Sequence, residues 1–179
     1  MDQLTHALAA GWRQFLEALH PDDRQTLLRV LREEYLEEAH DVVQFTQHAP
    51  RMPYPQVRAR LLRIAEEEQA HVAWLQDKIR GLGGEIPATS FTPQSGNKSW
   101  DCLLLDLQEE KRCCQDLLER MHLVEQIDAE IAEGLRRMRE EEMRHREEIL
   151  DMLTKIDPYS LPPGPREGHR TEAEGRINA

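Results

Sequence analysis

The chain has 179 residues, of which 32% are charged and 5% aromatic, and its formal net charge is −11. This length fits one domain with a single hydrophobic core and short appendages. The acidic balance argues against binding to nucleic acid or to an anionic membrane surface, and the few aromatic residues favour long solvated helices over a β-sandwich.

Cysteine content and hydropathy indicate a cytoplasmic protein. The three cysteines, Cys102, Cys113 and Cys114, supply neither a disulfide framework nor a CxxC metal-binding pair, which fits a reducing compartment. Residues 1–10 lack the basic region and the long apolar core of a secretory signal. Since no stretch approaches the roughly 18 apolar residues of a membrane span, we expect a soluble chain without membrane or nucleic-acid partners.

The first twenty residues predict a short amphipathic helix outside the main domain. Its apolar residues recur every three or four positions and therefore share one helical face; they are Leu4, Leu8, Trp12, Phe15 and Leu19. The pattern ends at Pro21, whose fixed φ and missing N–H suit the first turn of a new helix.

Four long helices of similar length follow, over residues 21–48, 55–81, 99–126 and 129–155. Three prolines between positions 49 and 55 end the first helix and begin the second. Glycines after position 80 stop the second helix, and Asp128 can cap the fourth. From residue 157 to residue 179, proline, glycine and charged residues predict a disordered tail.

The connection between the second and third helices determines the predicted topology. A helix of this length is roughly 40 Å long at 1.5 Å per residue. The other connections are short and require antiparallel neighbours, whereas the roughly 15 residues of this connection, at about 3.3 Å each, can span the whole bundle. Residues 21–156 are therefore predicted to form an up-down-down-up four-helix bundle with one long crossover.

Two of the four helices interrupt their apolar face with a Glu-x-x-His motif. Glu68 and His71 continue the apolar stripe of the second helix, and Glu142 and His145 continue that of the fourth, all at steps of three or four residues. Each motif lies about 20 Å from the N-terminal end of its helix. The two motifs are therefore expected at the same level of the core.

The other two helices each add one acid to this level. Glu110 lies on the apolar stripe of the third helix, and Glu38 occupies the corresponding place on the first. Distance from the following turn gives a different answer for the first helix, because Glu38 is about 15 Å from the helix end and Glu34 about 21 Å. Glu34 is therefore the alternative ligand. A third motif, Glu37-x-x-His40, has its histidine off the stripe, so we interpret it as a chance match that faces solvent.

Four carboxylates and two histidines in one apolar core need a counterion, because each unpaired buried ion costs several kcal/mol. Two divalent cations would balance four carboxylate charges, and two neutral histidines would complete the ligation. Oxygen and nitrogen donors favour iron or manganese, with zinc as a substitute. The predicted metal ligands are Glu38, Glu68, His71, Glu110, Glu142 and His145.

These motifs resemble a known family. Glu68-Gln-Ala-His71, Glu142-Met-Arg-His145 and the runs LQDKIRGLGGEIP and DLQEE are similar to the ferritin-like di-iron carboxylate proteins, especially bacterioferritin and rubrerythrin relatives, over residues 24–155. The resemblance implies a ferritin-like four-helix bundle that holds two iron ions. The roles that it implies are terminal ligation by Glu38 and Glu110, bridging by Glu68 and Glu142, and one ion each for His71 and His145.

The resemblance also implies a reaction class. Such a centre oxidises Fe(II) or reduces O2 or peroxide, so we expect a ferroxidase or peroxidase-type oxidoreductase that assembles as a homo-oligomer. No paired CxxC of a rubredoxin module is present, so electrons would come from an external donor protein or from Fe(II) itself. Two alternatives remain open at this point: an iron-storage oligomer of bacterioferritin type, and a metal-free helical adaptor.

Overall fold

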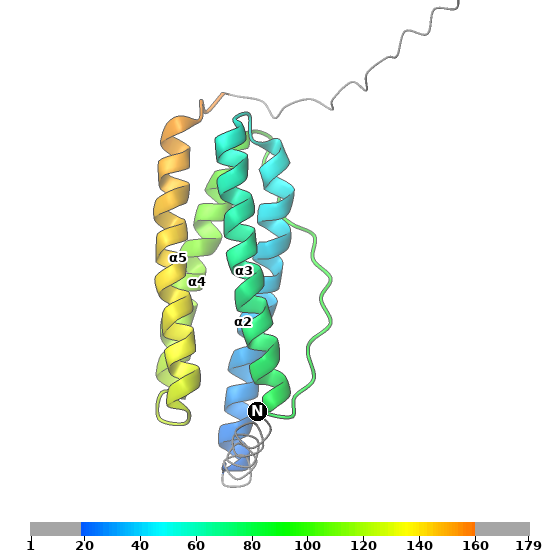
Figure 1. Ribbon diagram of the computed structural model, residues 1–179, viewed down its shortest axis with the longest axis vertical. Helices are drawn as coiled ribbons and strands as arrows, with labels where there is room; N and C mark the ends of the chain where they lie inside the picture. Colours follow the sequence, from blue (N-terminus) through cyan, green and yellow to red (C-terminus); the bar gives the residue numbers. More distant parts are fainter. Residues whose placement is uncertain (1–18, 160–179) are drawn as a thin grey trace, which may run out of the picture.

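The structure is a computed structural model in which residues 19–159 are described. These residues form four long helices, α2 (Pro21–His48), α3 (Pro55–Gly81), α4 (Ser99–Val124) and α5 (Ala129–Lys155), and one 3-10 helix, η1 (Ala49–Arg51) (Figure 1). The all-α class and the four predicted helices are confirmed, although α4 ends two residues earlier than predicted because residues 125–127 form a turn. The helix predicted over residues 1–20 and the tail predicted over 157–179 lie almost wholly outside the described residues.

The helix ends follow the residues that predicted them. Pro55 occupies the first turn of α3, where its missing N–H leaves no hydrogen bond unmade. The Asp128 carboxylate caps α5 by accepting hydrogen bonds from the backbone N–H groups of Glu130 at 2.9 Å and Ile131 at 3.0 Å. Just after α3, Gly83 has a φ of 69°, a conformation that favours glycine.

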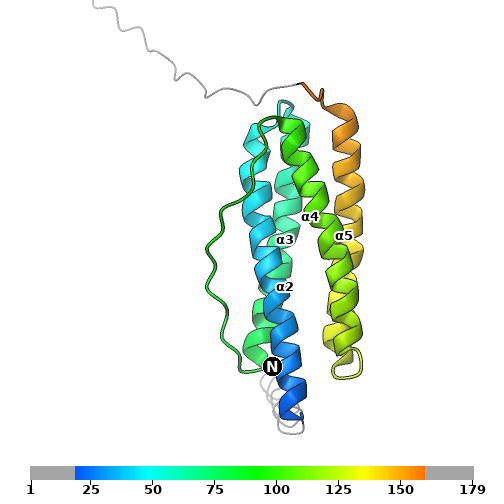
Figure 2. The ribbon, with the colours of Figure 1, turned by 180° about the vertical axis from the view of Figure 1, so that it is seen from behind.

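The bundle has the predicted up-down-down-up topology. Residues 82–98 run in an extended conformation along the outside of the bundle, from the end of α3 to the start of α4, so that α3 and α4 point the same way (Figures 1 and 2). Helix α2 packs mainly against α3, and α4 against α5; α2 also touches α4, and of these four neighbouring pairs α3 and α5 touch least. The side between α3 and α5 is therefore the least tightly closed side of the bundle.

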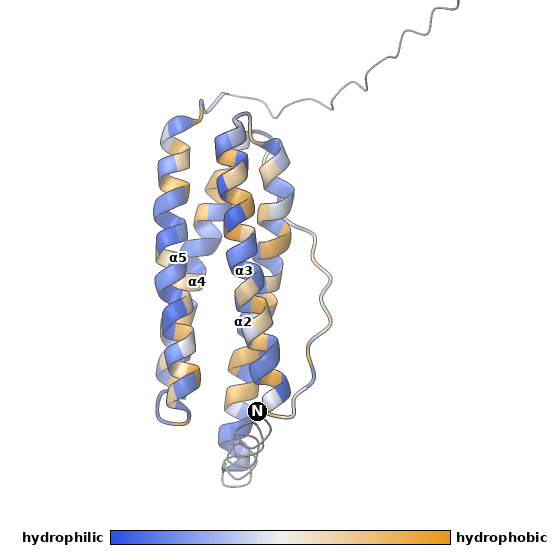
Figure 3. Ribbon diagram, viewed as in Figure 1, coloured by the Kyte–Doolittle hydropathy of each residue, from blue (hydrophilic) through white to orange (hydrophobic). Residues whose placement is uncertain are grey.

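The apolar core consists of two parts separated by a polar layer. One part lies towards the start of α2 and includes Leu31 and Leu75, and the other lies towards its end and includes Phe45 and Leu61. Hydrophilic residues interrupt the apolar ones along every helix (Figure 3), and among residues 19–159 no helix is long and apolar enough to cross a membrane. The middle layer is where the predicted metal ligands lie.

A buried histidine joins α2, α4 and the crossover. The Nδ1 atom of His48 lies 2.7 Å from the Asp106 carboxylate on α4, and its Nε2 atom lies 2.7 Å from the backbone carbonyl oxygen of Gln94 in the crossover. Both neighbours accept hydrogen bonds, so the ring donates from both nitrogens and is positively charged. Burial alone would lower the pKa of His48, but its contacts with Asp106 and Cys102 together more than offset burial and raise this pKa to about 10.

We expect His48→Ala to lower the free energy of unfolding by about 3 to 5 kcal/mol, because it leaves the buried Asp106 carboxylate without its counterion. Chemical denaturation measures this loss. The exposed His122→Ala serves as the control and should leave stability unchanged. Adding Asp106→Asn to His48→Ala should recover part of the loss, and a single-variant loss below about 1 kcal/mol would contradict the charged-pair assignment.

Candidate metal centre

The middle layer of the bundle receives one acid from each long helix and one histidine from each of α3 and α5. All six predicted ligands are buried, with none more than 6% exposed. Each interrupts an otherwise apolar helix face, so the same periodicity that buries the leucines on either side also buries these polar groups. The structure thus brings all six predicted site residues together; they are Glu38, Glu68, His71, Glu110, Glu142 and His145.

The six residues form two overlapping groups of potential metal donors. Within each group, one donor atom from every residue lies within 4.8 Å of the others. The first group consists of Glu38, Glu68, His71 and Glu142, and the second of Glu68, Glu110, Glu142 and His145. Two carboxylates, those of Glu68 and Glu142, belong to both groups and therefore lie between the two positions.

Glu68 faces a different histidine with each of its oxygens. Its Oε2 atom lies 2.9 Å from Nδ1 of His71, and its Oε1 atom lies 2.7 Å from Nδ1 of His145. Glu38 approaches the same nitrogen of His71 at 3.1 Å, whereas Glu110 lies on the side of His145, at 3.8 Å. This divergent geometry of Glu68 is the one that a carboxylate bridging two cations requires.

A second pair of acids orients the histidines from outside the cluster. Nε2 of His71 lies 2.9 Å from Glu141 on α5, and Nε2 of His145 lies 2.8 Å from Glu67 on α3. A carboxylate on the outer nitrogen keeps the inner nitrogen of a metal-binding histidine turned towards the metal. Glu141 and Glu67 were not predicted, although the sequence carries a signal: both motifs read Glu-Glu-x-x-His, and the first Glu of each contacts the histidine of the other.

The donor atoms of the cluster fit a cation. Buried polar atoms normally have a hydrogen-bond partner, yet several inner atoms here have none among residues 19–159. Even the two atoms that face each other at 2.7 Å, Glu68 Oε1 and His145 Nδ1, lack hydrogen-bond geometry. The unpartnered atoms are Glu38 Oε1, Glu68 Oε1, both side-chain oxygens of Glu110, Glu142 Oε1 and His145 Nδ1.

Crowding of the carboxylates changes their protonation in the metal-free chain. Burial raises the pKa of Glu38 and Glu110 well above the ordinary value of 4.5, and repulsion by neighbouring carboxylates adds to the effect. Burial and the charge of Glu68 raise the pKa of Glu142 to about 8. Without a cation, these three side chains therefore hold protons more tightly than exposed glutamates do.

Glu68 behaves in the opposite way because it touches both histidines. Burial opposes its ionisation, but the neighbouring His145 and His71 together hold the pKa of Glu68 below its ordinary value. Burial likewise lowers the pKa of each imidazole, but Glu68, Glu142 and the outer carboxylate together more than offset it and raise the pKa of both histidines to about 9. In the metal-free chain the two imidazolium groups thus offset part of the negative charge.

The structure favours Glu38 over Glu34 at this level of α2. Glu34 is buried one turn away, where Arg120 on α4 pairs with it and with Glu37. The distance to the end of the first helix pointed to Glu34 only because η1 continues α2 by another three residues. Glu38 lies thirteen residues before the end of η1, and Glu68 lies thirteen residues after the start of α3, so the two side chains are level.

Two further buried residues next to the cluster, Asp41 and Cys113, were not predicted. Asp41 on α2 lies 3.5 Å from the thiol of Cys113 on α4, which donates a hydrogen bond to it. His40 was expected to face solvent, but it is half-buried, lies 3.1 Å from Asp41 and packs edge-on against Phe91 of the crossover. Burial raises the pKa of Asp41 to about 6 in spite of the histidine.

Comparison with solved structures identifies the architecture. A ferritin-like di-iron carboxylate protein from Bacillus anthracis superposes with a TM-score of 0.66 at 22% identity, over 75% of this chain and 99% of the other. The chain has a ferritin-like fold. No family model matches the sequence of this ferritin-like chain, and a search of curated proteins found no relative.

Two further solved structures, a bacterioferritin and a thioferritin, have similar folds. Desulfovibrio desulfuricans bacterioferritin, described as having a di-iron site, has a TM-score of 0.70 and 22% identity, over 75% of this chain and 82% of the other. A dodecameric thioferritin from Bacteroides fragilis has a TM-score of 0.68 and 20% identity, over 80% of this chain and 92% of the other. This chain thus combines the ferritin-like fold with two groups of carboxylates and histidines that could hold metal ions, and two of the three neighbours are described as di-iron proteins.

The metal-free protein should lose stability as the pH rises. The pKa of Glu142 is higher in the folded chain, about 8 against 4.5, so its contribution is complete below pH 4.5 and is lost as the pH rises through about 8. The histidine contributions have the same sign and are lost as the pH rises through about 9. Thermal unfolding of EDTA-treated protein should therefore give a Tm that falls steadily across this window.

Glu142→Gln should flatten this pH dependence, because the amide does not titrate. The matched control is Glu140→Gln, an exposed acid on the same helix, which should keep the slope of the unchanged chain. A Tm that rises with pH in the metal-free protein would show that the buried carboxyls are ionised when the chain folds, contrary to this prediction.

Proposed function

We propose that this chain binds two iron ions in the middle layer of its bundle and uses them to oxidise Fe(II) or to reduce O2 or peroxide. The observation that supports the proposal most strongly is the pair of overlapping donor groups that share Glu68 and Glu142. Four carboxylates match the charge of two divalent ions, and oxygen with nitrogen donors suits iron. The di-iron descriptions of two structural neighbours agree with this choice of metal.

The donor groups suggest one role for each side chain. Glu68 and Glu142 would bridge the two ions, since both belong to both groups. Glu38 and His71 would complete the coordination of one ion, and Glu110 and His145 would complete that of the other. With only six protein side chains for two ions, each ion keeps a coordination position that a purely structural site would close.

Bound iron would supply one electron per ion and a binding place for O2 or peroxide. The chain would prepare this chemistry in three ways. Glu141 and Glu67 hold the two imidazoles in place through their outer nitrogens. The apolar clusters on either side of the layer exclude water, and the four carboxylates can move between bridging and terminal positions as the charge of the centre changes.

We also infer a homo-oligomer with Fe(II) and O2 or peroxide as its small-molecule partners, and an external donor protein where electrons do not come from Fe(II). The dodecameric state described for the similar thioferritin supports assembly. The native mass of the purified protein tests this point: a shell of many subunits would favour storage, and a dimer would favour catalysis alone.

Each chain should bind about two ions after anaerobic loading with Fe(II), as measured by elemental analysis of the desalted protein. Glu38→Ala should lower this stoichiometry, because it removes a donor from one of the two groups. The control is Glu34→Ala, which should keep the stoichiometry and instead lower stability, since it leaves the buried Arg120 with fewer partners. Less than half an ion per chain, or a larger loss of iron in Glu34→Ala, would count against the assignment.

Loaded protein should oxidise Fe(II) faster than buffer at the same pH when stopped-flow mixing delivers O2 or peroxide. Glu68→Ala and His145→Ala should remove the whole gain, because each breaks a donor group. Arg136→Gln, an exposed change on α5, should leave the rate as it was. If the bound iron remains Fe(II) in air for as long as free Fe(II) in buffer does, the oxidative role is wrong and a storage or structural role replaces it.

A further inference from the structure

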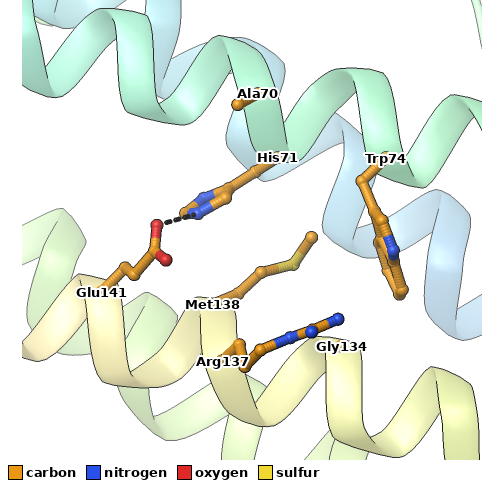
Figure 4. A pocket seen from close by; sticks show the side chains of 7 residues that line it. All are labelled: Ala70, His71, Trp74, Gly134, Arg137, Met138 and Glu141. Carbon is orange, nitrogen blue, oxygen red and sulfur yellow. Dashed lines mark hydrogen bonds and ion pairs between the residues drawn. The ribbon is translucent and has the colours of Figure 1, made fainter.

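A pocket opens between α3 and α5 beside the candidate metal centre. Its volume is about 330 Å³, at the small end of the range for pockets that bind organic molecules. It lies on the side of the bundle where the helices touch least, and Figure 4 shows its side chains converging from both helices. The lining residues are Ala70, His71, Trp74, Gly134, Arg137, Met138 and Glu141.

The apolar part of the pocket depends on one glycine. A Cβ atom on Gly134 would lie 2.2 Å from Cζ2 of Trp74, closer than any real contact, so the bare backbone of α5 is what allows the indole to pack there. Met138 is buried and points into the pocket between His71 and Arg137 (Figure 4). Indole and thioether together offer a surface suited to the apolar body of a small ligand.

The polar part of the pocket has one cation that no other side chain neutralises. Arg137 is exposed and runs towards the Trp74 end of the pocket (Figure 4), and within residues 19–159 it makes no hydrogen bond or ion pair. Glu141, the acid of the pocket, is already engaged by His71 at 2.9 Å and has Arg144 3.8 Å away. The unbalanced charge of the pocket is therefore positive, in a chain whose net charge is −11.

We propose that this α3/α5 pocket binds a small organic monocarboxylate with an apolar body. The carboxylate pairs with the Arg137 guanidinium, whose planar fork matches it with two hydrogen bonds. The apolar body lies on Trp74 and Met138, so its far end reaches the ring of His71. A divalent cation is disfavoured here by Arg137, and O2 or peroxide needs neither the guanidinium nor the indole.

The position of the ligand gives it a role at the centre. Nδ1 of His71 faces Glu68 and Glu38, while the pocket reaches the other side of the same ring. A bound acid therefore places its apolar end against the His71 ring, on the side away from Nδ1 and the other donor atoms, so that it contacts a ligand of the proposed centre. That the bound acid is a substrate of the metal centre rests on the proposed function. That the acid binds in this pocket does not, because the lining residues are present without any metal.

The test uses 4-fluorobenzoate as the probe and follows its fluorine NMR signal during titration with the full-length, metal-free protein. Saturable broadening is expected, with much weaker broadening for the neutral 4-fluorobenzamide. Arg137→Gln should weaken binding of the acid by roughly tenfold or more, the usual loss when a charged hydrogen-bond partner is removed. The matched control is Arg136→Gln, since Arg136 is the adjacent arginine but pairs with Glu133 and Glu140 outside the pocket.

A steric variant tests the same site without a change of charge. Gly134→Ala should displace the Trp74 indole and abolish binding of 4-fluorobenzoate, with circular dichroism confirming that the helices are retained. Equal binding of the acid and the amide would overturn the proposal, as would no binding at millimolar probe, or equal losses in Arg136→Gln and Arg137→Gln.

Repeating the titration with zinc-loaded protein separates this proposal from the proposed function. Binding that needs zinc and survives Arg137→Gln would mean that the carboxylate binds the metal directly, and would overturn the α3/α5 pocket as the site. Binding in the metal-free chain supports the pocket whatever the iron experiments give. Failure of iron loading or iron oxidation would overturn only the proposed function.

Discussion

Mutual repulsion among four buried carboxylates is the constraint on which the rest of this bundle depends. One acid per helix meets at a single level, and each lies at most 2% exposed, where an ion without a partner is costly. The two histidines offset part of the charge, and raised pKa values let other carboxyls keep their protons. Without metal, the imidazolium charges and the retained protons are what limit the repulsion in this layer. Two divalent cations would neutralise the carboxylates in their place.

The surrounding structure serves this layer from three directions. Apolar clusters above and below it exclude water and supply the burial that holds the helices together. The reciprocal contacts of Glu67 and Glu141 hold the histidines and link α3 to α5, which otherwise touch little. The crossover, anchored on His48, allows α3 and α4 to run in the same direction. The weakly closed α3/α5 side is also where the pocket reaches His71.

Several parts of the site were beyond the reach of periodicity. Glu34 and Glu38 lie one turn apart on nearly the same face, and only the extra length of η1 makes Glu38 level with Glu68. Asp41 and Asp106 also fall at steps of three or four from Phe45 and Leu103, but the spacing does not show what pairs with a buried acid, and their partners, Cys113 and His48, come from a distant helix. Contacts of this kind join residues more than fifty positions apart, so local patterns do not contain them.

The sequence by itself determined the four helices, their order, the need for one crossover and five residues of the central layer, and it left Glu34 and Glu38 as alternatives for the sixth. It did so because helix periodicity, proline and glycine positions and connection lengths are local properties of the chain. The tertiary structure decided which oxygen of Glu68 faces which histidine and which acids contact the outer nitrogens of those histidines. It also decided that the Trp74 indole packs against the bare backbone of Gly134 beside a pocket. These features depend on the spacing and rotation of packed helices, which arise only when all four side-chain surfaces meet.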